Sequence, residues 1–267
     1  MSSIILPQGF LPQGFLFDKD GVIVDSEPSK FLALQRAVFY LTGRKEVTED
    51  QRFYDWYYGR VGMSGEETCK EAVQRFKLEV DPNELYRGNN GLNAQRAKML
   101  DSEPAIYIRD TREFISQIPK DIPIGVASSD YHTYIERHLS ETGLEERIKC
   151  RVSGAKTEGD VPIGGDKPEP HAYLELARKM KVNPLDCIGV EDTWQGATAL
   201  RRAGVFTIVR INPLSGKFDF SSLSDAHKPH IITKSLSEYG FKRVLEEYNI
   251  YISGRDKKLP FGWWGFE

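Results

Sequence analysis

Two pairs of carboxylates follow short apolar segments of the chain, at a spacing that suits catalysis. Asp18 and Asp20 come directly after Gly14–Phe17, and Glu191 and Asp192 follow a second apolar segment. Side chains two residues apart at the end of a strand can point the same way. One carboxylate of the first pair can then attack phosphorus, while the other moves the proton of the leaving group. Asp20, beside other carboxylates, can hold a proton near neutral pH and act as a general acid and then as a base for water.

Ser128 and Lys167 are the candidates for binding an anion. Ser128 ends an apolar segment, and Lys167 opens a predicted helical segment. A hydroxyl can donate a hydrogen bond to phosphate, and an ammonium can offset the charge on its equatorial oxygens. Ligands of doubly wound sheets bind beyond the carboxyl ends of the strands. We therefore expect Ser128, Lys167 and the carboxylates to share one edge of a sheet.

Several carboxylates at one edge would repel each other unless a cation binds there. Magnesium prefers oxygen ligands and leaves positions for water or phosphate oxygens. It would also reduce the repulsion between an anionic nucleophile and a phosphate. Asp18 and Asp192 are the expected Mg²⁺ ligands, with Glu191 as a ligand or as a partner of one.

Alternating strand and helix patterns predict the elements that must position these residues. Strands that alternate with helices form parallel sheets with right-handed crossovers, so the chain is predicted to be an α/β protein. We expect strands over 14–17, 122–127, 148–152, 187–190 and 206–209, and helices over 131–141, 170–180 and 194–203.

The first strand is separated from the others by about 75 residues with helical signals. Gly43 ends one apolar helical pattern, Ser64 and Glu67 form a capping box for another helix, and Pro82 begins a third. A helical block inside a sheet protein is best explained as an inserted domain. The predicted organisation is a mobile leader (1–13), a catalytic core (14–27 and 104–252), a helical cap (28–103) and an aromatic, glycine-rich tail (253–267).

Composition excludes several classes of protein. The net charge of -3 provides no basic field, so nucleic acid is a poor partner. No apolar run approaches the roughly 20 residues that span a bilayer. Cys69, Cys150 and Cys187 form no CxxC pair, and no secretory signal is visible, so we expect a cytoplasmic location. We expect a monomer or a weak homo-oligomer.

Four segments resemble the motifs of the haloacid dehalogenase superfamily, in the order and with the gaps that the family has. They are FDKDGVIVDSE (17–27), VASS (126–129), DKPEP (166–170) and GVEDT (189–193). The resemblance extends over residues 14–212. It implies a Rossmann-like parallel-sheet core with an inserted helical cap domain, and Mg²⁺-dependent phosphoryl transfer through an aspartyl-phosphate.

The same resemblance implies a role for each motif residue. Asp18 would be the nucleophile and Asp20 the acid and base. Asp18, the backbone carbonyl of Asp20 and Asp192 would bind Mg²⁺, while Ser128 and Lys167 would bind phosphate. Asp20 favours phosphatase or phosphomutase chemistry, because ATPase-type relatives have threonine at this position and dehalogenase relatives lack the acid.

Within the superfamily the chain most resembles the group of β-phosphoglucomutase and small sugar-phosphate phosphatases. The mutase has a histidine at the position of Lys30, so the lysine weakens a mutase interpretation. We therefore expect a phosphatase that acts on a small phosphorylated metabolite such as a sugar phosphate. A β-phosphoglucomutase-type phosphomutase is the alternative. A non-catalytic binding protein is disfavoured, because Asp18 and Asp20 are both present.

Arg60 is the candidate for contacting the rest of the substrate. It lies in a glycine-flanked loop of the cap, where relatives place specificity contacts. An arginine can bind a second phosphate or a carboxylate, and a solvated surface arginine is the alternative. Ser129 and Asp130 are expected to cap the following helix rather than to take part in catalysis.

Overall fold

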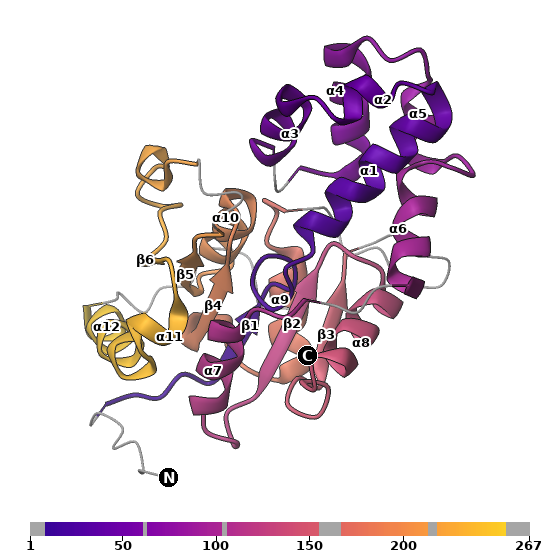
Figure 1. Ribbon diagram of the computed structural model, residues 1–267. Helices are drawn as coiled ribbons and strands as arrows, with labels where there is room; N and C mark the ends of the chain where they lie inside the picture. Colours follow the sequence, from indigo (N-terminus) through magenta and orange to yellow (C-terminus); the bar gives the residue numbers. More distant parts are fainter. Residues whose placement is uncertain (1–8, 61–62, 103–105, 155–166, 213–217, 255–267) are drawn as a thin grey trace. The chain divides into compact units, whose positions relative to one another are not determined.

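The computed structural model describes residues 9–60, 63–102, 106–154, 167–212 and 218–254. The chain divides into two compact units, with boundaries between Val24 and Asp25 and between Ile106 and Tyr107. Most of the expected leader and nearly all of the expected tail lie outside the described residues. Figure 1 follows the chain through both units.

The first unit contains a six-stranded sheet in which every neighbouring pair of strands is parallel. The predicted α/β class with a parallel sheet is therefore confirmed. Its strand order is β3-β2-β1-β4-β5-β6, so β1 lies in the interior. The strands are β1 (Gly14–Phe17), β2 (Ile124–Ser128), β3 (Cys150–Ser153), β4 (Cys187–Glu191), β5 (Phe206–Arg210) and β6 (Ile231–Thr233).

Alternating side chains of β1 face two different helical layers. Phe15 packs against Phe114 of α7 (Arg109–Gln117) and Phe241 of α12 (Phe241–Gly254), with ring centroids 6.1 Å away in both cases. Leu16 belongs to a buried cluster with residues of α9 (His171–Met180) and α10 (Trp194–Arg202). The continuous apolar segment thus forms a strand that is buried on both faces.

The helix between β2 and β3, α8 (His132–Glu141), begins differently from the expectation. Its N-cap residue is Tyr131, which makes no side-chain capping bond. The expectation that Ser129 and Asp130 cap this helix is therefore wrong. The carboxylate of Asp130 instead pairs with Lys19 of the first motif. The remaining short elements of this unit are the 3-10 turns η1 (Pro184–Asp186) and η2 (Phe220–Ser222) and the helix α11 (Leu236–Tyr239).

The second unit is the helical segment inserted after β1. Three predicted helix ends are present: Gly43 ends α1 at a φ of 69°, Ser64 and Glu67 form a capping box, and Pro82 begins α5. Four aromatic residues of α3, namely Phe53, Trp56, Tyr57 and Tyr58, pack into the unit's own hydrophobic core. Its helices are α1 (Glu27–Thr42), α2 (Lys45–Thr48), α3 (Gln51–Tyr58), α4 (Gly65–Phe76), α5 (Pro82–Arg87) and α6 (Leu92–Ser102).

The two ends of the segment 25–106 lie side by side. Val24 forms an antiparallel bridge with Tyr107. The Ile108 amide donates to the Ile23 carbonyl at 2.8 Å, and the Asp25 amide donates to the Ile106 carbonyl at 2.8 Å. The inserted segment therefore leaves the first unit and returns to it through one short two-stranded ribbon.

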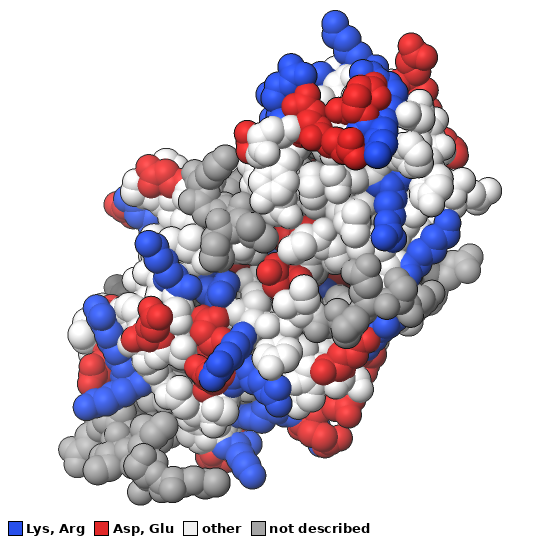
Figure 2. Space-filling view, in the orientation of Figure 1, with Lys and Arg blue, Asp and Glu red and all other residues white. Residues whose placement is uncertain are grey.

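Among the described residues, no helix has the length and apolar character needed to cross a membrane. Basic and acidic side chains are intermixed on the face shown in Figure 2. This mixture agrees with a chain that carries 36 basic and 39 acidic residues.

Candidate active site

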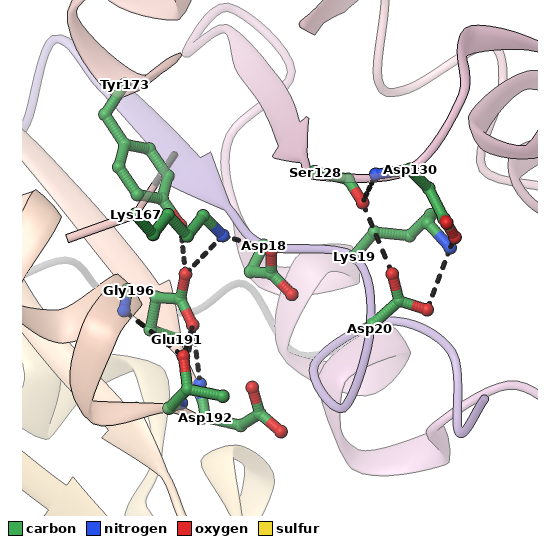
Figure 3. A network of polar contacts seen from close by, with 11 residues as sticks. Asp18, Lys19, Asp20, Ser128, Asp130, Lys167, Tyr173, Glu191, Asp192 and Gly196 are labelled. Carbon is green, nitrogen blue, oxygen red and sulfur yellow. Dashed lines mark hydrogen bonds and ion pairs between the residues drawn. The ribbon is translucent and has the colours of Figure 1, made fainter. Parts of the chain in front are cut away.

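Strand register brings the first and fourth motifs together. In the β1–β4 pair Phe17 lies opposite Val190, and the Asp18 amide donates to the Val190 carbonyl at 2.9 Å. The next residue on each strand is a carboxylate, Asp18 after β1 and Glu191 at the end of β4. Two acidic side chains far apart in the sequence therefore meet at the carboxyl edge of the sheet (Figure 3).

Asp18, Glu191 and Asp192 form a buried acidic cluster. Each offers one carboxylate oxygen, and the three oxygens lie within 4.8 Å of one another. The exposed fractions of these residues are only 6%, 0% and 6%. Three hard oxygen donors at this spacing fit the ligand preference of Mg²⁺. The cluster is the part of the described structure where the predicted cation would bind.

Lys167 partly neutralises the acidic cluster. Its Nζ donates to Asp18 Oδ1 and to Glu191 Oε1, the latter at 2.5 Å. Burial opposes the charge on Lys167, but the adjacent Asp18 and Glu191 carboxylates raise its pKa above the ordinary value. Lys167 therefore stays a cation at the position where the resemblance places a phosphate-binding residue.

Glu191 accepts several hydrogen bonds that no sequence pattern predicts. Its Oε1 accepts from the hydroxyl of the fully buried Tyr173 on α9, and its Oε2 accepts from the Asp192 amide at 3.1 Å. The N-cap of α10 is Thr193, whose Oγ1 accepts from the Gly196 amide at 3.2 Å. Neither Glu191 nor Asp192 is thus needed as the helix cap.

Asp18 has a strongly perturbed acidity. Its pKa is raised from 3.8 to about 7: burial is the largest cause, the nearby Glu191 and Asp20 carboxylates also raise it, and Lys167 lowers it. A carboxyl group with this pKa is about half protonated at neutral pH, and a bound cation would favour its carboxylate form. The electrostatics of Asp18 therefore match a residue that functions next to a bound cation.

Asp20 and Ser128 form a second group next to the acidic cluster. Asp20 Oδ2 accepts from Ser128 Oγ at 3.3 Å, and Asp20 Oδ1 accepts from Lys19 Nζ at 2.9 Å. Ser128 Oγ also accepts from the Asp130 amide at 3.2 Å. The Asp20 carboxylate is not one of the three that make up the acidic cluster.

Arg60 lies in the second unit. Its guanidinium pairs with Glu71, at 2.6 Å between Nη2 and Oε1, and its side chain is 40% exposed. The structure thus assigns this arginine a partner inside its own unit.

Two residues that contact the predicted site residues were not themselves predicted. Lys19 stands between Asp18 and Asp20, and Tyr173 lies on an apolar helix face where it resembles any core aromatic residue. The signal for Lys19 was a charged residue next to a buried strand. For Tyr173 no sequence signal distinguishes its hydroxyl from that of other tyrosines.

Comparisons with known proteins agree with this geometry. The family model for haloacid dehalogenase-like hydrolases matches residues 12–204. The chain is 27% identical over 199 residues to the fructose-1-phosphate phosphatase YqaB of Escherichia coli (strain K12), covering 72% of this chain and 93% of the relative. It is 26% identical over 194 residues to the phosphorylated carbohydrates phosphatase of Thermotoga maritima, covering 72% and 82% of the two chains.

The fold is shared with solved structures. A β-phosphoglucomutase structure from Clostridium difficile matches with a TM-score of 0.67 and 19% identity, over 91% of this chain and 100% of the other. The family match extends from the first motif to the end of α10 and includes every residue of the acidic cluster. The chain is therefore a member of the haloacid dehalogenase-like hydrolase family.

Proposed function

We propose that the protein is a Mg²⁺-dependent phosphatase that hydrolyses a small phosphorylated metabolite, most simply a sugar phosphate, through an aspartyl-phosphate. The observation that carries the proposal is the buried acidic cluster joined to Lys167. Such a cluster is costly to bury without a cation and an anion to compensate it. Bound Mg²⁺ would screen the repulsion between the carboxylates and the substrate phosphate.

In the first half of the reaction, an Asp18 carboxylate oxygen attacks phosphorus. The bond between phosphorus and the sugar oxygen breaks, its electron pair stays on that oxygen, and Asp20 supplies the proton. Lys167 Nζ, which already contacts Asp18, lies where it can stabilise the charge on the transferred group. Ser128 supplies a hydroxyl to the phosphate.

In the second half, the Asp20 carboxylate takes a proton from water as that water attacks the phosphorus of the aspartyl-phosphate. The bond to Asp18 breaks and inorganic phosphate leaves. Each residue thus returns to its starting state. The burial of the acidic cluster keeps bulk water away from it, which strengthens each electrostatic contact.

The proposed substrate class is supported by the names of the relatives. One acts on fructose 1-phosphate, another on phosphorylated carbohydrates, and a third is hexitol phosphatase B. A phosphomutase is the second candidate, since a β-phosphoglucomutase of Bacillus subtilis is 23% identical over 200 residues. The absence of the mutase histidine favours the phosphatase: Lys30 stands at its position, and its ammonium pairs with Glu27 at 2.9 Å.

A panel of phosphorylated metabolites tests the proposal. Purified protein with Mg²⁺ is incubated with fructose 1-phosphate, hexitol phosphates and β-glucose 1-phosphate, and inorganic phosphate and glucose 6-phosphate are both measured. Phosphate release that requires Mg²⁺ and disappears in Asp18→Asn supports the phosphatase. Glucose 6-phosphate without phosphate release would support the mutase.

The matched control is Asp225→Asn, the same chemical change at a side chain that is 97% exposed. It should keep wild-type turnover. Turnover in Asp18→Asn, or in fully chelated wild-type protein, would contradict the proposed mechanism.

A further inference from the structure

Lys19 is a lysine without solvent contact. Its exposed fraction is 0%, although lysine is among the residues that are least often fully buried. Its Nζ lies 2.9 Å from Asp20 Oδ1, 2.8 Å from Asp130 Oδ2 and 3.1 Å from His138 Nδ1. Figure 3 shows its ammonium between the carboxylates of Asp20 and Asp130. We call Lys19, Asp20, Asp130 and His138 the Lys19 network.

The three contacts use all three protons of the ammonium. A lysine ammonium has three donors and no acceptor, so each proton has one acceptor in the Lys19 network. The contact with His138 requires an unprotonated Nδ1. Burial and the charge of Lys19 lower the pKa of His138 to about 4, so its ring is neutral and can accept. The position of Nζ is therefore fixed from three directions.

Lys19 holds Oδ1 of Asp20 at 2.9 Å. The bond to Oδ1 is charge-assisted and comes from a fully buried donor. Oδ2 accepts from Ser128 Oγ at 3.3 Å. Ser128 is also the hydroxyl proposed to donate to phosphate, so its contact with Oδ2 would change when substrate binds.

We propose that Lys19 is a positioning residue, which anchors Asp20 through Oδ1 so that Oδ2 faces the proton transfer. The proposal rests on the proposed phosphatase function, because it concerns the general acid of that reaction. Lys19 does not itself bind phosphate, since its side chain is buried and its protons are used by the Lys19 network.

If Lys19 positions Asp20, the effect of removing Lys19 should depend on the leaving group of the substrate. When the phosphorus–oxygen bond of a sugar phosphate breaks, the basic sugar oxygen needs the proton from Asp20. The oxygen of p-nitrophenyl phosphate leaves as a stable anion and needs no proton. A displaced Asp20 should therefore slow the first substrate and spare the second.

The experiment compares wild type with Lys19→Met, which keeps an unbranched side chain one atom shorter and removes its charge and donors. The measured quantity is kcat/KM, because it reports the first phosphoryl transfer, for fructose 1-phosphate or a better sugar phosphate from the panel, and for p-nitrophenyl phosphate. We expect a loss of about 10- to 100-fold for the sugar phosphate, less than the roughly 100- to 10,000-fold that a general acid contributes because Asp20 itself remains, and less than about threefold for p-nitrophenyl phosphate.

Asp130→Asn is the matched control, because it changes the same buried network but leaves the contact between Lys19 and Asp20. It should change kcat/KM for both substrates by the same factor. A double-mutant cycle then tests whether Lys19 acts through Asp20. In an Asp20→Asn background, Lys19→Met should cause no further loss of sugar phosphate turnover.

Two results would overturn the proposal: an equal loss for both substrates in Lys19→Met, or a full additional loss in the Asp20→Asn background. If thermal melting shows that Lys19→Met does not fold, Lys19→Met/Asp130→Asn removes one charge of each sign and is measured in its place. A wild-type protein that releases no phosphate from any substrate would instead refute the proposed function, so the two failures can be distinguished.

Discussion

A Cβ atom on Gly21 would lie 1.8 Å from Oδ2 of Asp192. Gly21 also has a φ of +75°, in the left-handed region that other residues rarely adopt. The turn that follows Asp20 and one carboxylate of the acidic cluster therefore fit together only because residue 21 has no side chain.

Gly21→Ala should consequently damage the acidic cluster as well as the turn. We expect Mg²⁺ affinity and turnover to fall by at least about tenfold, because Asp192 must move away from the new methyl group. The control is Gly43→Ala, which has a φ of +69° but no atom within 4 Å of the added Cβ. Both variants should lose about 1 kcal/mol of stability from backbone strain, and Mg²⁺ titration should separate them. Equal Mg²⁺ affinity in the two variants would contradict the argument.

Tyr173→Phe removes the hydroxyl that donates to Glu191 Oε1 and leaves the ring in place. The buried Glu191 then loses one of its hydrogen bonds, so we expect a loss of about 1–3 kcal/mol in the free energy of unfolding and a lower kcat. Tyr239→Phe is the matched control, because its hydroxyl donates to Glu247 at 2.5 Å on a partly exposed helix pair. Urea denaturation with activity assays compares them. A Tyr173→Phe variant no more affected than the control would show that this contact contributes little.

Mg²⁺ binding should depend on pH through Asp18. Burial raises the pKa of Asp18 from 3.8 to about 7, so below pH 7 a proton must leave before the cation binds. Calorimetry should show Mg²⁺ affinity falling by up to roughly tenfold per pH unit below 7, with one proton released. Asp18→Asn should bind more weakly and with little pH dependence. A wild-type affinity that stays constant from pH 8 to pH 6 would contradict this reasoning.

The raised pKa of Asp18 also determines how the stability of the metal-free protein changes with pH. The folded protein holds the Asp18 proton more tightly than the unfolded chain, for which the ordinary pKa of 3.8 applies. The resulting stabilisation is complete below pH 3.8 and is lost as the pH rises through about 7. Saturating Mg²⁺, which binds the carboxylate, should offset this loss at pH 8 in thermal melts.

Ser64→Ala should weaken the inserted unit alone. Ser64 Oγ accepts from the Glu67 amide at 3.2 Å, and the Glu67 carboxylate accepts from the Ser64 amide. Loss of such a cap costs about 1 kcal/mol. Ser64→Asn, which retains a capping oxygen, should restore most of it. Hydrogen exchange of α4 amides measures the effect, and protection that is unchanged in Ser64→Ala would argue against the cap.

The sequence predicts the central strands well because they are apolar and are followed by polar residues. The strand over 14–17 has the bounds of β1, and the predicted strand over 206–209 ends one residue before β5 does. The strand β6 was not predicted, because it has only three residues and one of them, Ile232, is exposed. Such a short segment has no periodicity to detect.

For the site, the ends of parallel strands predict which residues meet, as they do for Asp18, Glu191 and Asp192. The partners that hold these side chains depend on three-dimensional packing. Asp130 resembles a helix cap in the sequence, but its carboxylate reaches Lys19, 111 positions away along the chain. The contact between Tyr173 and Glu191 likewise depends on how α9 packs on the sheet, which periodicity does not determine.

The two-stranded ribbon at Val24 and Tyr107 affects how the fold tolerates changes in the length of the inserted segment. Because the ends of the inserted segment adjoin, residues 25–106 form a closed loop that begins and ends at two neighbouring points of the chain. The entropy of closing a loop grows slowly with its length, so a longer, shorter or different insert could be exchanged at this position with little effect on strand order. The parallel sheet can thus keep its strand order while helical segments of different length are inserted after β1.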